Sequence, residues 1–158
     1  MNNKPLKRSQ EMQILSRDHH FGLLFTWKIK QGINKKVDSL RMKDYVNFFW
    51  NQHLKDHFLD EEVLLFNRFS SEELCIQAKK DHQQIIDLIE RVNAASQGDY
   101  AVYEKLFTFL DQHIRFEERV VFPHLEVIIP ESVLTSIGHF LEKHHQDFVD
   151  DFKDEFWK

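Results

Sequence analysis

The chain has 158 residues, which suits a single domain with one core, and its net charge of −5 argues against nucleic acid as a partner. Only four glycines and three prolines interrupt it, a scarcity that favours long helices over strands and turns. The one cysteine, Cys75, excludes an internal disulfide framework and fits a reducing compartment. No apolar run approaches ~20 residues and the N-terminal stretch lacks a secretory pattern, so we expect a cytoplasmic protein with no membrane partner.

Hydrophobic periodicity predicts five helices. We place them at about residues 12–31, 40–66, 70–96, 99–127 and 131–156. Because the first four are joined by short connections, the simplest all-α fold is an antiparallel up-down-up-down four-helix bundle over about 12–128, with an additional C-terminal helix. We expect one domain over residues 1–158.

The second and fourth helices carry the same string, H-x-x-x-E-E, followed by an apolar run. The strings are HFLDEE at 57–62 and HIRFEE at 113–118. For this composition, chance predicts only about 0.07 such strings by counting template matches. An Asp-His pair precedes each string by one helix, as Asp18-His19 and as Asp81-His82. The chain therefore repeats one pattern, Asp-His followed by H-x-x-x-E-E.

This spacing points to metal chemistry. Residues i and i+4 lie on one helix face, and the apolar neighbours place both faces inside the bundle. A buried carboxylate without a partner costs on the order of several kcal/mol, and no Lys or Arg shares these faces. Four imidazoles and two carboxylates match the ligand set of a dinuclear metal centre. The candidate ligands are His19, His57, Glu61, His82, His113 and Glu117.

Several assignments stay open at this point. His20 fits the apolar continuation of the first helix as well as His19 does, although the repeated Asp-His pair favours His19. Glu62 or Glu118 can replace its neighbour as a bridging carboxylate. His53, one turn before the second-helix string, is an extra ligand, a donor that orients a carboxylate, or a partly wet histidine near the site.

Other polar residues are expected away from the centre. Asp18 and Asp81 are candidates to orient the histidines, but we expect them to be exposed. His124 lies too far along its helix, ~16 Å from His113, to share the cluster. The remaining histidines of the C-terminal helix are expected at the surface or in packing, and Cys75 is expected in the core; these histidines are His139, His144 and His145.

Four pieces of sequence resemble the hemerythrin-like, or HHE cation-binding, family. They are LSRDHHFGLL, HFLDEEVLLF, KKDHQQI and HIRFEERVVFP, in the family's order over about residues 14–125. The resemblance implies a four-helix bundle around a non-haem di-iron centre with an oxo or hydroxo bridge and an open position for a small ligand. It also implies the same six ligands, with Glu61 and Glu117 bridging. By analogy, His19 and His113 hold one iron, and His57 and His82 hold the other.

The sequence differs from the oxygen-carrying members, which have H-x-x-x-H in the third helix, because Ala78 and Ile86 flank His82 here. The histidine set resembles that of iron–sulfur-centre repair proteins, whose cysteine-bearing N-terminal domain has no counterpart in this sequence.

These features favour a protein that binds, senses or reacts with O2, NO or H2O2, in oxidative or nitrosative stress or iron-centre maintenance. No catalytic residue beyond the metal is evident. The alternatives are a metal-regulated sensor or interaction module, and a purely structural zinc or other divalent site. A homodimer is one option for the assembly.

Overall fold

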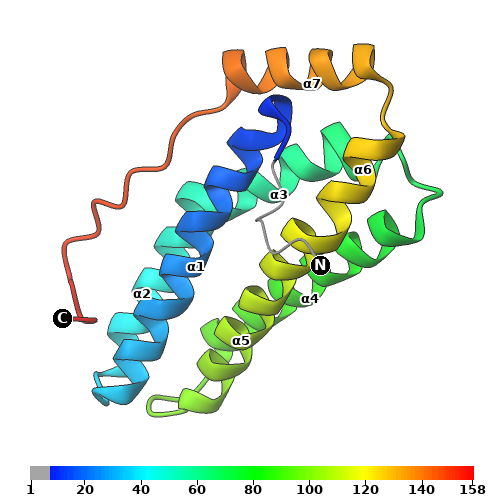
Figure 1. Cartoon of the computed structure of the whole chain (residues 1–158). Helices are drawn as coiled ribbons and strands as arrows, with labels where there is room; N and C mark the ends of the chain where they lie inside the picture. Colours follow the sequence, from blue (N-terminus) through cyan, green and yellow to red (C-terminus); the bar gives the residue numbers. More distant parts are fainter. Residues whose placement is uncertain (1–7) are drawn as a thin grey trace, which may run out of the picture.

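The computed structural model describes residues 8–158, and all the regular structure in that range is helical (Figure 1). A short 3-10 turn, Gln10–Met12, leads into the first long helix. The helices are α1 (Gln13–Asn34), α2 (Ser39–Phe49), α3 (Lys55–Glu61), α4 (Glu73–Ala94), α5 (Tyr100–Phe116), α6 (Phe122–Ile128) and α7 (Glu131–His144). The predicted second helix therefore corresponds to α2 with α3, and the fourth to α5 with α6.

Three π-helical segments interrupt the long helices around the candidate ligands. They span Trp50–Leu54, Glu62–Phe66 and Glu117–Val121. Each closes with a backbone hydrogen bond between residues five apart, such as that from the Asn67 amide to the Glu62 carbonyl at 2.8 Å. Single π turns inside α-helices are frequent at functional sites. The periodicity of the sequence did not reveal them.

Pro123 gives a local reason for the third π segment. Proline has no N–H and therefore leaves one carbonyl of the preceding turn without a helical donor. In the π register that carbonyl belongs to Glu118, five residues earlier. It accepts a hydrogen bond from the Arg8 guanidinium at 2.6 Å instead. The segment before α1 thus satisfies the backbone group that Pro123 leaves free.

The long helices form the predicted antiparallel bundle. α1 packs against α5 and α2, and α4 packs against the same two helices, so the four make a square (Figure 1). The apolar interior consists of two clusters, one built around Phe25, Phe49 and Tyr103 and the other around Leu15, Leu65 and Phe122. A layer of buried histidines and carboxylates accompanies them. The all-α bundle predicted from the sequence is confirmed.

The C-terminal helix is shorter than the predicted 131–156. α7 lies across one end of the bundle and stops at His144, and residues 145–158, the C-terminal segment, run back along α1 and α2 without regular structure (Figure 1). The helical spacing of apolar residues from Leu134 to Phe152 predicts a helix that continues beyond His144. Tertiary packing overrides that local pattern, because Phe148 and Phe156 are buried against the α1–α2 side of the core.

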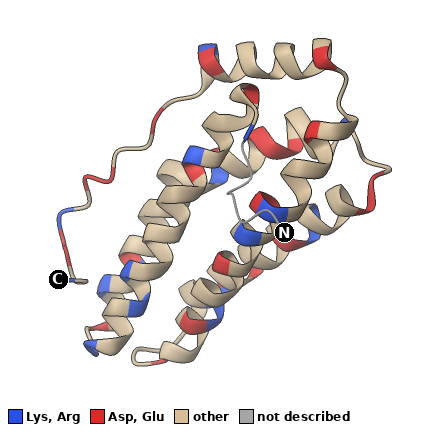
Figure 2. Cartoon of the chain, in the orientation of Figure 1, with Lys and Arg blue, Asp and Glu red and all other residues tan. Residues whose placement is uncertain are grey.

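Charge pairs also hold the C-terminal segment in place. Figure 2 shows acidic positions spaced along it and basic positions on the facing parts of α1 and α2. Lys28 donates to Asp150 at 2.6 Å, and Arg41 pairs with Asp154 at 2.5 Å. Lys28 also lies over the Trp157 ring, 4.0 Å from its centroid. Within residues 8–158, no helix is both long enough and apolar enough to cross a bilayer.

Candidate metal centre

The six candidate ligands come together in the middle of the bundle. Their donor atoms form two groups, each with all atoms within 4.8 Å of one another: His19, His57, Glu61 and Glu117 in one, and His82, His113, Glu61 and Glu117 in the other. All six residues are buried, and both glutamates have no exposed surface. One set of four helices therefore supplies two adjoining groups that share two carboxylates.

Each shared carboxylate lies between a histidine of one group and a histidine of the other. Glu61 Oε1 is 3.3 Å from His57 Nε2 and 3.1 Å from His82 Nε2. Glu117 Oε1 is 3.0 Å from His19 Nε2 and 3.1 Å from His113 Nε2. A carboxylate between two imidazole pairs is well placed to bridge two cations.

The grouping of the donor atoms differs from the histidine pairing expected by analogy. His19 groups with His57, and their ring centroids are 4.9 Å apart; His82 groups with His113, at 5.0 Å. The reason is the packing of α1 on α3. Asp18, the neighbour of His19, already holds the His57 ring, so the same turn of α1 brings His19 to that ring.

Every one of these histidines has a second carboxylate on its other ring nitrogen. The contacts are His57 Nδ1 to Asp18 (2.9 Å), His82 Nδ1 to Glu62 (2.9 Å), His113 Nδ1 to Asp81 (3.0 Å) and His19 Nδ1 to Glu118 (3.0 Å). They form a closed ring around the bundle, because each long helix supplies the carboxylate for the next helix's histidine. A carboxylate on Nδ1 fixes the ring and aims the Nε2 lone pair at a metal.

This carboxylate ring explains the repeat. The Asp of each Asp-His pair and the second Glu of each H-x-x-x-E-E string orient a histidine on a neighbouring helix. The expectation that Asp18 and Asp81 are exposed is wrong, since both are buried. Glu62 and Glu118, the alternative bridges, lie on the outer ring nitrogens instead of between the groups.

The inward-facing atoms lack other partners. Six of the inward-facing nitrogen and oxygen atoms are fully buried and make no hydrogen bond. They are His57 Nε2, His82 Nε2, His113 Nε2, both Glu61 oxygens and Glu117 Oε2. Since buried polar groups are nearly always satisfied, a cluster of such atoms needs an occupant. Imidazole nitrogens and carboxylate oxygens converging in this way fit a pair of metal ions.

Without metal, protons take the place of the missing positive charge. Burial lowers the pKa of His57, but the charge of Glu61 and the hydrogen bond to Asp18 outweigh it and raise that pKa to about 10. Burial likewise lowers the pKa of His113, yet the charge of Glu117 and the bond to Asp81 raise it to about 9. Burial raises the pKa of Glu61, but the neighbouring histidines hold it well below its ordinary value.

Aromatic rings pack directly on the histidines. Phe58 stacks on His82 with centroids 3.8 Å apart and planes 9° apart, and Phe122 stacks on His19 at 5.3 Å. Rigid apolar neighbours keep the imidazoles in place and exclude water from the centre.

The structure places the other candidate histidines outside the six-residue cluster. His20 is exposed, so the structure places His19 with the cluster. His124 pairs with Glu72 at 2.9 Å, away from the centre. His53 is 5% exposed rather than partly wet, and burial lowers its pKa to about 4.

Sequence reasoning missed two residues that support the outer carboxylates, His145 and Arg8. His145, which was expected at the surface or in packing, lies 2.9 Å from Asp18 and so connects the C-terminal segment to the His57 side of the centre. Arg8 reaches Ser16 at 3.1 Å, and Ser16 donates to Glu118 at 2.8 Å. Neither residue carries a local signal, because each lies about a hundred residues or more along the chain from the carboxylate it supports.

The family model for the Hemerythrin HHE cation binding domain matches residues 18–125 and, in a second overlapping match, 77–154. The chain belongs to the hemerythrin HHE cation-binding domain family. Comparisons with curated proteins and with solved structures gave no significant match. The family, together with the buried His–Glu cluster of this hemerythrin-like protein, indicates a metal-binding site.

Proposed function

We propose that the six clustered residues bind two iron ions and that the centre binds, senses or reacts with a small diatomic or peroxide ligand: O2, NO or H2O2. The supporting observation is the pair of histidine groups that share two buried glutamates, with their inner donor atoms otherwise unsatisfied. Mixed imidazole and carboxylate donors with no thiolate suit iron among the common metals.

When bound, an iron pair would supply reversible electron transfer and a place for a small ligand to bind. The protein supplies the rest. The outer carboxylates orient the imidazoles, and Glu61 and Glu117 lie between the two groups. Phe58 and Phe122 pack on the rings, and the buried surroundings limit access to small molecules.

Anaerobic reconstitution with ferrous iron tests this proposal. We expect two irons per chain and an optical change on exposure to O2 or NO. His57→Ala and His113→Ala each remove one histidine from a different group and should lower the iron content, whereas the exposed His20→Ala should not. Fewer than two irons in the parent protein, or no loss in His57→Ala, would contradict the assignment.

A second candidate function, a metal-dependent switch, is favoured by the contact between His145 and Asp18. Asp18 also holds His57, so the metal state can act on the C-terminal segment through this carboxylate. Limited proteolysis of the C-terminal segment with and without iron tests it, and identical cleavage in both states would exclude it.

A further inference from the structure

A small void lies directly against the metal centre. It has a volume of about 10 Å³, room for one water-sized molecule, and reaches His19, His57, His113 and Glu117. Its opposite wall is apolar and consists of Gly22, Leu54, Phe58, Leu110 and Ile114. A Cβ at residue 22 would come within 2.6 Å of Ile114 Cδ1, so the glycine keeps this space open.

A much larger pocket, of about 550 Å³, opens at the surface between α3 and the C-terminal segment. Besides Asp18, its lining carries four aspartates, one pair on α3 and one pair on the C-terminal segment, and no Lys or Arg. The aspartates are Asp56, Asp60, Asp147 and Asp151. We call this the outer pocket.

The void and the outer pocket share three lining residues, Asp18, His53 and His57. These side chains therefore form the wall between them. A third pocket, beside Arg17 and His20, shares only Asp18 with the void. The outer pocket is thus the surface pocket with the broader contact to the void.

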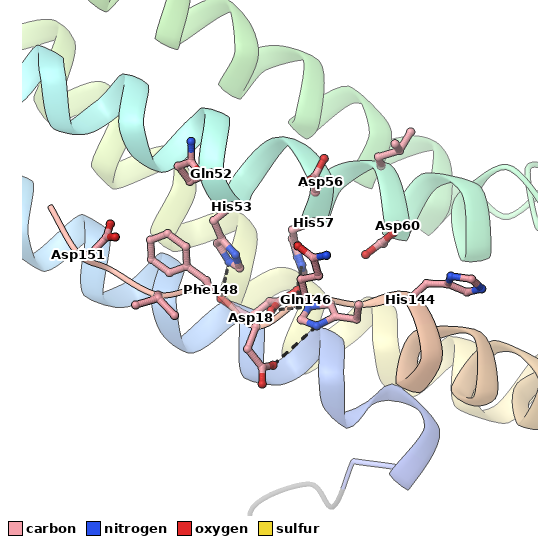
Figure 3. Close-up of a pocket in the computed structure, with 14 residues that line it drawn as sticks. Asp18, Gln52, His53, Asp56, His57, Asp60, His144, Gln146, Phe148 and Asp151 are labelled. Carbon is pink, nitrogen blue, oxygen red and sulfur yellow. Dashed lines mark hydrogen bonds and ion pairs between the residues drawn. The ribbon is translucent and has the colours of Figure 1, made fainter.

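His53 has the weakest polar contacts in this wall, although the rings of Phe21, Phe49 and Phe148 pack around it. Asp18 and His57 hold each other at 2.9 Å, and His145 also contacts Asp18. The Nε2–H of His53, by contrast, reaches only the carbonyl oxygen of Asp18, at 3.4 Å. Figure 3 shows His53 beside Phe148 of the C-terminal segment, and their ring centroids are 4.8 Å apart. A rotation of the His53 ring breaks one long hydrogen bond and no ion pair.

We propose that small ligands enter from the outer pocket past His53, with Phe148 packed behind it, and that the acidic lining selects uncharged ligands over anions. This inference rests on the proposed function, since it concerns the approach to the same centre. Aspartates around a pocket whose lining has no Lys or Arg lower the local concentration of anions but leave NO, O2 and H2O2 unaffected. The small size of the void favours ligands of a few atoms over larger molecules.

The test uses iron-loaded protein and two probes, NO for the uncharged ligand and azide for the anion, with association rates measured by stopped flow. His53→Ala should raise both rates by roughly threefold or more, because it removes the barrier. Phe148→Ala, farther from the centre, should act in the same direction. His20→Ala is the matched histidine control and should leave both rates unchanged.

A separate double variant tests whether the aspartates select against anions. Asp56→Asn with Asp60→Asn should raise the azide rate by about threefold to tenfold at low ionic strength, less in 0.15 M salt, and leave the NO rate unchanged. Equal effects on both probes would overturn the selection.

The iron content distinguishes a wrong entry route from a wrong metal centre. If the parent protein and His53→Ala both hold two irons but neither His53→Ala nor Phe148→Ala changes a rate, the route is wrong and the metal centre stands. If the parent protein does not hold two irons, the proposed function itself fails. If His53→Ala loses iron, Phe148→Ala decides, and unchanged rates in that variant reject the route.

Discussion

Asp81→Asn removes one charge from the carboxylate ring while keeping the shape of the side chain. Asp81 accepts the Nδ1–H of His113 at 3.0 Å and an amide N–H of Gln77 at 2.8 Å. Asparagine retains an oxygen for His113, so the ring orientation should survive. What is lost is the negative charge that makes the imidazole a stronger donor to a metal.

Loss of a carboxylate behind a metal-binding histidine typically lowers metal affinity by about 10–100-fold, or about 1.4–2.7 kcal/mol. Asp81 contacts the His82–His113 group and not the His19–His57 group. We therefore expect one equivalent of ferrous iron to weaken by this factor and the other to remain close to its original affinity. Anaerobic titration against a chromophoric chelator resolves the two equivalents.

Asp111→Asn is the matched control, because Asp111 lies on the same helix as His113 but pairs only with the exposed Arg115 at 3.0 Å. It should leave both affinities unchanged. The reasoning fails if Asp81→Asn changes neither equivalent, if it weakens both equally, or if the control shows the same loss.

Three further results are expected. The metal-free protein should lose stability as the pH rises from about 6.5 towards 9–10, because His57 (pKa about 10) and His113 (pKa about 9) bind protons more tightly in the folded than in the unfolded chain. Iron should stabilise the protein more as the pH rises, since it displaces those protons. Thermal unfolding with and without iron measures both trends. Gly22→Ala should fill the void and weaken NO binding without changing the iron content. Adding Ile114→Val should restore NO binding, because valine lacks the Cδ1 that the new Cβ would meet, and NO titration measures both effects. Phe58→Ala should cost about 3–5 kcal/mol in denaturant unfolding of the metal-free protein.

Each of these has a clear contrary result. A metal-free protein whose stability rises between pH 6.5 and 9 would mean that the histidines are not proton-loaded. Unchanged NO affinity in Gly22→Ala would place the ligand elsewhere. Leu59, the exposed neighbour of Phe58, is the control for packing, and Leu59→Ala should cost less than 1 kcal/mol or so.

Much of the fold was predictable because its signals are local. Apolar periodicity gave the bundle, and the spacing of His57 and Glu61 gave a shared helix face. The π segments were not predictable in the same way, because they depend on which backbone carbonyl finds a donor. Pro123 and the distant Arg8 settle that question for one of them.

Some features of the site could not be predicted from the sequence for a similar reason. The repeated Asp-His and Glu-Glu pairs were visible, but the partner of each outer carboxylate lies on another helix. Assigning Asp18 to His57, rather than to solvent, requires the packing of α1 on α3. The same packing brings His19 beside His57, a grouping that differs from the pairing expected by analogy. In the C-terminal segment a local pattern misleads, because Phe148 and Phe152 have helical spacing but pack on the bundle as part of an irregular chain.

A crystal structure of the iron-loaded protein, with anomalous scattering at the iron edge, tests the central claim most directly. The account predicts two iron peaks, one at His19 and His57 and one at His82 and His113, with Glu61 and Glu117 reaching both. A single peak, or iron bound in the outer pocket with the six residues unliganded, would contradict it.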